Sequence, residues 1–227
     1  MLFFFVYLKY SIIVLGVVDM KKIIFDLDNT LLFIDNTWFL AYQEFIDKYN
    51  LDITPGVLYD CIGKLEEDNP NCVITKEFFI NYLNDFLSIN IDIDALDVFL
   101  DLYANIDLVN VDVIREVLSY LSTKYELYSY SNWFSFNQLK RLKRYRLDKY
   151  FTKVYGWDII PSKPSIKGLN IIVGNNKDDF IFIGDSITYD LEVPDKIGID
   201  TIFYNRKNIS QNKYREIFNI EELKNIL

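Results

Sequence analysis

Hydrophobic and polar positions change their spacing along this chain, and the change predicts two kinds of structure. Before about residue 108 the apolar positions recur at helical intervals in three segments: 37–49, 75–88 and 92–104. Pro55-Gly56 and Asn69-Pro70 read as turns in this region. From about residue 108 onward, apolar strands alternate with helices, which is typical of βαβ units and a parallel sheet. The pattern therefore predicts a helical insert within an α/β core.

The strands of this core are predicted from short apolar runs. The runs are 23–25, 125–131, a short one near 153–156, 180–184 and 200–205, with a helix at 111–124 and further helices between the later strands. A short hairpin after Leu32 remains open. Pro194 lies early in the helix that follows residues 180–184, and it is expected to shorten or kink that helix.

Polar residues follow several of these runs where the strand ends. Asp26 and Asp28 follow the first, Ser131 and Asn132 the second, and Asp185 and Asp190 the fourth, and Lys163 lies in a loop before a helix. Parallel α/β sheets bind their ligands at the carboxyl ends of the strands, so these side chains are expected to meet at one edge.

Such a collection of groups fits phosphoryl chemistry on a bound cation. Mg²⁺ prefers oxygen ligands, and a cation together with Lys163 would relieve the repulsion between the aspartates. A phosphoryl group needs neutralised oxygens, an in-line nucleophile and a proton donor for the leaving group. One Asp carboxylate can be that nucleophile, and a second can serve the leaving oxygen and then activate water.

Composition narrows the chemistry further. The 227 residues include no histidine, which removes mechanisms built on a His base and the common His-containing zinc sites. A net charge of −9 argues against general nucleic-acid binding. The two cysteines, Cys61 and Cys72, form no CxxC motif and are interpreted as reduced thiols.

Charge also divides the chain into two parts. Residues 33–107 hold 15 acidic residues, three lysines and no arginine, whereas the remainder is mildly basic. An insert without arginine has no bidentate clamp for a second anionic group, so a neutral or weakly anionic leaving group is expected. The basic run at 140–146 is interpreted as a solvated helix face. The aromatic residues at helical spacing are interpreted mainly as core of the insert, with substrate contact as the alternative: Trp38, Phe39, Tyr42, Phe45 and Tyr49.

The first 19 residues are apolar but interrupted by Lys9, Tyr10 and Ser11. A membrane span needs roughly 20 apolar residues, and Met20 followed by two lysines resembles a natural start. The favoured interpretation is an over-long start or a loosely attached segment on a cytoplasmic protein. The alternative is a membrane anchor with Lys21 and Lys22 as its positive flank.

Together, these polar residues and their order make the chain resemble the phosphatase branch of the haloacid dehalogenase superfamily with an α-helical, C1-type cap. "DLDNT" is similar to the family's DxDxT motif and "YSYSN" to its second motif. "SKP" is similar to the Lys-Pro motif and "GDSITYD" to the GDxxxxD form of the fourth motif. All four occur in order, which makes the joint match far more specific than any one of them.

The resemblance implies a role for each matching residue. Asp26 would be the nucleophile and a Mg²⁺ ligand, and Asp28 the general acid/base, with its carbonyl as a further ligand. Ser131, with Asn132 beside it, and Lys163 would hold the phosphoryl oxygens. Asp185 and Asp190 would complete the metal site, and Thr30 would orient the loop.

These inferences combine into one expected organisation. Residues 1–19 are an extension, 20–33 and 108–227 a Rossmann-like core, and 34–107 an inserted helical cap. The expected function is Mg²⁺-dependent hydrolysis of a small phosphate monoester, either a phosphorylated metabolite or a nucleotide, through an aspartyl-phosphate. A phosphomutase and a non-catalytic phosphate-binding regulatory module are the alternatives, and Asp28 disfavours a dehalogenase.

Overall fold

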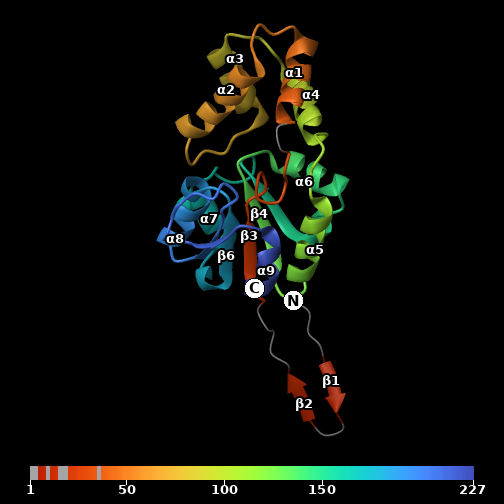
Figure 1. The fold of residues 1–227 in the computed structure, drawn as a ribbon, viewed down its shortest axis with the longest axis vertical. Coiled ribbons are helices and arrows are strands. Elements are labelled where there is room, and N and C mark those ends of the chain that lie inside the picture. The colour runs from red at the N-terminus through yellow and green to blue at the C-terminus, as the bar shows by residue number, and fades with distance from the viewer. Residues whose placement is uncertain (1–4, 9–10, 15–19, 35–36) are drawn as a thin grey trace.

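A parallel β-sheet forms the centre of the molecule (Figure 1). The computed structural model describes residues 5–8, 11–14, 20–34 and 37–227. Within these residues, six parallel strands pair in the order β5-β4-β3-β6-β7-β8. The strands are β3 (Lys22–Phe25), β4 (Glu126–Ser131), β5 (Phe151–Gly156), β6 (Phe180–Gly184), β7 (Asp200–Tyr204) and β8 (Arg215–Ile217). The predicted α/β class with a parallel sheet is confirmed, and β8 is a strand that the sequence pattern did not indicate.

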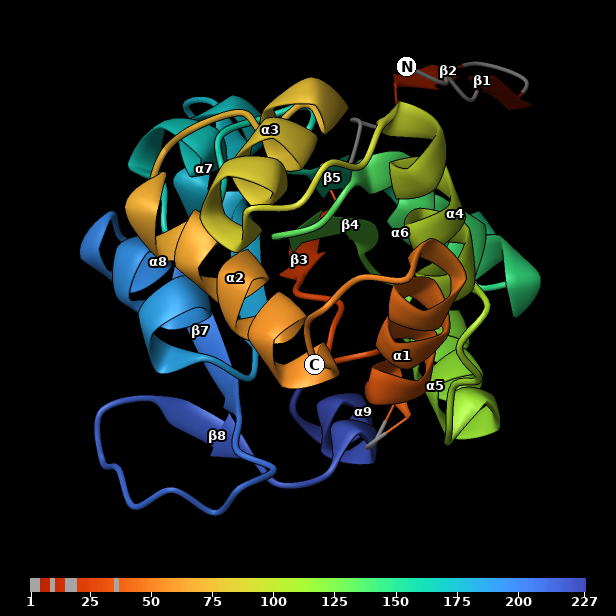
Figure 2. The ribbon, with the colours of Figure 1, turned by 90° about the horizontal axis from the view of Figure 1, so that it is seen from above.

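Helices cover both faces of this sheet (Figures 1 and 2). One layer consists of α5 (Val111–Leu121), α6 (Ser135–Arg144) and α9 (Leu223–Ile226), and the other of α7 (Ile166–Val173) and α8 (Glu192–Lys196). Strand β3 serves both layers because successive side chains point to opposite faces. Ile23 and Phe25 pack with α5, while Ile24 packs with α7, and all three are fully buried.

A helical cap is inserted between β3 and β4, as the sequence predicts. Its helices are α1 (Trp38–Tyr49), α2 (Pro55–Asp68), α3 (Lys76–Leu87) and α4 (Ile93–Ala104). The interpretation of Pro55-Gly56 as a turn was wrong, since Pro55 is the first residue of α2. Thr54 caps this helix, its Oγ1 accepting from the Val57 amide at 3.3 Å, and proline at the first helical position costs no hydrogen bond.

The cap is seated on two loops of the core. Phe79 of α3 packs against Trp133, Phe134 and Trp157, with ring centroids 5.5–5.9 Å apart. The Ile74 amide donates to the Trp157 carbonyl at 2.7 Å, next to this aromatic cluster. The hydrophobic core of the cap therefore continues into the loops that follow β4 and β5.

The N-terminal segment adds a small separate sheet. Strands β1 (Phe5–Leu8) and β2 (Ser11–Val14) pair antiparallel, with Phe5 opposite Val14. The predictions of an over-long start or a membrane anchor concern residues 1–19, of which 1–4, 9–10 and 15–19 lie outside the described residues. No helix in the described ranges has the length and apolar character needed to cross a bilayer.

Candidate active site

The carboxyl ends of β3 and β6 bring the first two acidic residues together. The Asp26 amide donates to the Ile183 carbonyl at 2.9 Å, so the pairing of β3 with β6 extends one residue past the strand. Phe25 is in register with Ile183, which places Asp26 next to the turn that carries Asp185. A parallel register thus joins two residues that are distant in sequence.

Asp190 reaches the same point through an unusual turn. Residues Ile187–Leu191 form a π-helical turn, a form often found at functional sites, before α8 begins. The Ser186 amide donates to Oδ2 of Asp190 at 3.0 Å. A Cβ on Gly184 would lie 2.3 Å from that oxygen, so the approach of Asp190 requires a glycine at the end of β6.

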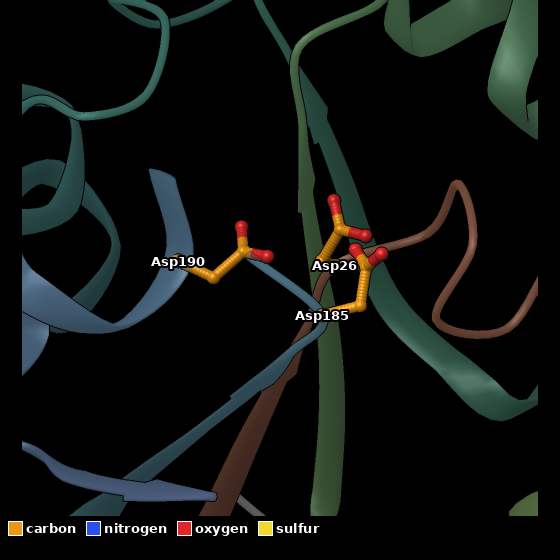
Figure 3. Close-up of side chains that lie close together, drawn as sticks. All are labelled: Asp26, Asp185 and Asp190. Carbon is orange, nitrogen blue, oxygen red and sulfur yellow. The ribbon is translucent and has the colours of Figure 1, made fainter. Parts of the chain in front are cut away.

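Lys163 bridges two of these carboxylates. Its Nζ donates to Oδ1 of Asp26 and to Oδ1 of Asp190, both at 2.6 Å, and all three residues are buried. One carboxylate oxygen from each of Asp26, Asp185 and Asp190 lies within 4.8 Å of the others, and Figure 3 shows the three groups facing one another. Among the described residues, Oδ2 of Asp26 is buried with no hydrogen-bond partner.

Burial dominates the ionisation of this cluster. It raises the pKa of Asp26 well above its ordinary value, against the opposing effect of Lys163. Burial and the neighbouring Asp190 charge raise the pKa of Asp185 to about 6. Burial alone would lower the pKa of Lys163, but Asp190 and Asp26 outweigh it and raise that pKa. Three crowded carboxylates within 4.8 Å of one another are the donor set that a hard divalent cation such as Mg²⁺ satisfies, so these residues fit the expected metal.

Asp28 lies beside this cluster and is held by α6. Nη1 of Arg141 donates to one of its carboxylate oxygens at 2.5 Å, and Nε2 of Gln138 donates to the other at 2.5 Å. Gln138 also donates to Oγ of Ser131 at 2.8 Å, so the Ser131 hydroxyl keeps its hydrogen for a ligand. Burial alone would lower the pKa of Arg141, but the Asp28 charge opposes this and the pKa is raised.

Arg141 and Gln138 are site residues that the sequence interpretation missed. The basic run at 140–146 was interpreted as a solvated face, and this was wrong for Arg141, which is 1% exposed. The signal was available in the helical spacing. Gln138 and Arg141 share the buried face of α6 with Leu142, and polar residues on a buried face need partners.

The two remaining predicted site residues have structural contacts. Asn132 closes a loop, since its Oδ1 accepts from the Lys163 amide at 2.7 Å and its Nδ2 donates to the Lys163 carbonyl at 2.9 Å. This pair of bonds positions the Lys163 backbone. Thr30 is fully buried in a turn closed by the Thr30 amide on the Leu27 carbonyl at 3.2 Å. The possible hairpin after Leu32 falls partly on residues 35–36, which lie outside the described ranges; of the described residues there, Phe33 forms an isolated bridge with Val109.

The cap closes a cavity of about 510 Å³ over these groups. The cap residues that line it are Ile34, Trp38, Tyr42, Tyr59, Ile62, Glu66 and Tyr103. The aromatic residues on α1 therefore differ in their contacts. Phe45 packs in the core of the cap, whereas Trp38 and Tyr42 both pack against that core and line the cavity. Lys207 of the core also lines the cavity.

Glu66 is the acidic group that the cap contributes to this cavity. Its Oε2 accepts from Nδ2 of Asn132 at 3.1 Å, which connects α2 to the loop that follows β4. Burial raises the pKa of Glu66 to about 7. The sequence signal for this residue is its spacing, because Tyr59, Ile62 and Glu66 lie at i, i+3 and i+7 on one face of α2.

Comparison with known proteins connects this geometry to a family. The chain matches the family model described as haloacid dehalogenase-like hydrolase over residues 23–204. Its fold is similar to that of the HAD-hydrolase YfnB from Bacillus subtilis, solved bound to magnesium, with a TM-score of 0.74 and 22% identity over 91% of this chain and 98% of that chain.

Two other solved structures are similar in the same way. The 2-haloacid dehalogenase from Pseudomonas syringae pv. Tomato DC3000 gives a TM-score of 0.65 and 18% identity, with 91% of this chain and 97% of that chain covered. The HAD phosphatase from Thermococcus onnurineus gives 0.62 and 19%, with 91% and 97% covered. At these identities the likeness concerns the fold. No curated protein matches the chain.

Proposed function

The chain belongs to the haloacid dehalogenase-like hydrolase family, and on that premise we propose that it hydrolyses a small phosphate monoester through an aspartyl-phosphate, with Mg²⁺ as cofactor. The observation that carries the proposal is the state of Asp26. Lys163 holds one of its oxygens at 2.6 Å, while the other is buried without a partner among the described residues. A carboxylate fixed in this way is prepared to attack phosphorus.

In the first step, Oδ2 of Asp26 forms a bond to phosphorus as the bond from phosphorus to the leaving oxygen breaks. Asp28 gives its proton to that leaving oxygen, and the alcohol departs. Ser131 donates its hydroxyl hydrogen to a phosphoryl oxygen, and Lys163 neutralises the charge that develops there.

In the second step, water attacks the phosphorus of the aspartyl-phosphate. Asp28, now a carboxylate, takes the proton of this water, and the bond from phosphorus to Asp26 breaks to release phosphate. Gln138 and Arg141 hold the two oxygens of Asp28 and so direct it toward the reacting atoms.

Asp26, Asp185 and Asp190 would hold the Mg²⁺, with the Asp28 carbonyl as a further proposed ligand. When bound, the cation supplies charge neutralisation for the phosphoryl oxygens. Asp28 also supports phosphatase over dehalogenase activity, since displacement of a halide requires no proton donor for the leaving group.

Substitution of the two aspartates separates their roles. Asp26→Asn is expected to abolish turnover of p-nitrophenyl phosphate, because an amide is a poor nucleophile. Asp28→Asn leaves Asp26 able to attack this activated ester but slows the second step, by roughly 10² to 10⁴ in rate. Intact-protein mass spectrometry of Asp28→Asn after mixing is expected to show the added mass of one phosphoryl group, absent from Asp26→Asn.

Near wild-type turnover by Asp26→Asn contradicts the mechanism. A protein that binds phosphate without catalysis, the regulatory alternative, shows neither turnover nor an adduct in any form. Asp85→Asn serves as a control on the exposed face of α3, and it is expected to match wild type.

A further inference from the structure

The cap half of the cavity differs chemically from the core half. The basic residues that line the cavity, Lys163 and Lys207, both belong to the core. Lys163 already donates to Asp26 and Asp190. The cap contributes one carboxylate, Glu66, and several aromatic rings. A leaving group that enters this half meets negative charge and π-electron density.

The rings form a continuous band from the cap to the core. Trp38 contacts Tyr59 with centroids 4.6 Å apart and Tyr42 at 5.1 Å, Tyr42 contacts Tyr103 at 6.4 Å, and Tyr103 contacts Trp133 at 4.8 Å. The ring planes of these pairs are inclined at 34°, 81°, 65° and 46°, so the rings do not form two parallel plates. Trp38 and Tyr59 already touch each other, which leaves no slot between them for a planar base.

One of these rings, Tyr103, already makes a cation–π contact with Arg141. The guanidinium carbon of Arg141 lies 4.9 Å from the centroid of Tyr103. Aromatic rings attract cations through their negative faces, and rings grouped around a carboxylate are a common means of recognising ammonium groups.

The Glu66 carboxylate is engaged through one of its two oxygens. Among the described residues its one hydrogen bond runs through Oε2 to Asn132, which leaves Oε1 for a ligand. Glu66 is only partly exposed, and removing part of a carboxylate from water with so few partners costs stability, a cost that a bound cation would offset.

We infer that Glu66, with Trp38, Tyr42, Tyr59 and Tyr103, binds a compact cationic group on the leaving alcohol, so that the substrate is the phosphate ester of a short amino alcohol. The inference rests on the proposed function. Glu66 accepts a hydrogen bond from Asn132, which also holds the backbone of Lys163, so the carboxylate lies close to the proposed phosphate site and a short alcohol is the proposed link between cation and ester oxygen.

A matched pair of esters tests this directly. Phosphocholine and 3,3-dimethylbutyl phosphate have the same shape, but the second carries carbon in place of the charged nitrogen. For the Mg²⁺-loaded enzyme, kcat/KM is expected to favour phosphocholine by about tenfold or more. In Glu66→Gln the preference is expected to fall to about twofold, mainly through KM for phosphocholine.

Two variants complete the design. Tyr59→Leu removes a ring and is expected to reduce the same preference without touching a charge. Glu67→Gln changes the next residue of α2, whose side chain is 60% exposed, and is expected to leave both esters unaffected. Equal turnover of the two esters by wild type, or an undiminished preference in Glu66→Gln, overturns the inference.

Failure of the inference and failure of the proposed function look different. Turnover of p-nitrophenyl phosphate without preference between the matched esters leaves a phosphatase and removes the cation site. If no ester is hydrolysed, the phosphatase proposal fails, and titration calorimetry of both esters into the Mg²⁺-loaded protein still decides whether the cation is recognised.

Discussion

Arg141 pairs with the charged form of Asp28, which is the form that would accept a proton from water in the proposed second step. Arg141→Met is therefore expected to slow breakdown of the aspartyl-phosphate and to lower kcat for p-nitrophenyl phosphate by about 10- to 100-fold. The phosphorylated protein should accumulate in intact-mass spectra, whereas Arg141→Lys should restore part of the rate. Lys143→Met on the exposed side of α6 is the matched control.

Loss of rate in Arg141→Met without accumulation of the phosphorylated protein would assign Arg141 a purely structural role. The thermal midpoint, measured alongside, separates that outcome from unfolding. If Arg141→Met turns over at the wild-type rate, Arg141 has no role in turnover.

Glu66 links the cavity to stability through its pKa. Its pKa rises from an ordinary 4.5 to about 7 in the folded protein. Between these values the folded state binds more protons than the unfolded state, so stability falls as pH rises through this window and the loss is complete above pH 7. Glu66→Gln is expected to stabilise the ligand-free protein by roughly 3 kcal/mol at pH 8 and by less than about 1 kcal/mol at pH 5.

Thermal unfolding of both proteins at pH 5 and pH 8 measures this difference. Lys163 opposes the raised pKa of Glu66, while Asp28 and Asp190 reinforce it. An equal shift in midpoint at both pH values would show that Glu66→Gln acts through packing instead of charge.

At the scale of elements, Asp190 can approach the end of β6 only because Gly184 there has no side chain. Gly184→Ala is expected to push Asp190 away, since the new Cβ would lie 2.3 Å from Oδ2. The strand still pairs on both sides, so the expected loss is in Mg²⁺ affinity and in turnover, by about 10²-fold or more, with a small change in the far-UV spectrum. Gly63→Ala in α2, where nothing lies within 4 Å of the new Cβ, is the control and should gain up to about 1 kcal/mol.

Unchanged Mg²⁺ binding by Gly184→Ala would show that Asp190 is not confined by the strand end. Isothermal titration calorimetry with Mg²⁺ alone measures this affinity independently of activity.

Strand ends were predictable from sequence because a buried parallel strand is a short apolar run, and its last residue is where a polar group appears. The predicted run at 180–184 and the observed β6 coincide, and Asp185 follows directly. Helix α2 was missed because Pro55 was interpreted as a breaker, although a preceding Thr54 marks it as a start. Arg141 and Glu66 were missed because their roles depend on which helix face meets the cavity, and that is decided by tertiary packing.

At the scale of the whole molecule, a cation held between two neighbouring strands and the turn after β6 should stabilise the fold. At ten times its dissociation constant, Mg²⁺ contributes about 1.4 kcal/mol. For a chain of this size that corresponds to a rise in thermal midpoint of about 3–6 °C, reversed by EDTA. Asp185→Asn is expected to lose the rise while remaining folded.

A midpoint insensitive to Mg²⁺ at millimolar concentrations would argue against the metal site, whatever the activity. The same scan with Ca²⁺ distinguishes a rigid site from a permissive one, because Mg²⁺ demands near-octahedral geometry and Ca²⁺ does not.

The position of β3 between β4 and β6 has a consequence for synthesis on the ribosome. Among the six strands of the parallel sheet, β3 emerges before β4 and β5, but its other neighbour, β6, emerges much later. Until then the nascent sheet presents β3, which is apolar from Ile23 to Phe25, as an open edge, the kind of edge that pairs with other chains. A chain stalled before residue 180 would thus be prone to association, and it would hold the proposed nucleophile, Asp26, without Asp185 or Asp190. Residues 180–190 both cover this edge and supply the remaining proposed metal ligands, so the open edge is expected to be paired by the time the proposed site is complete.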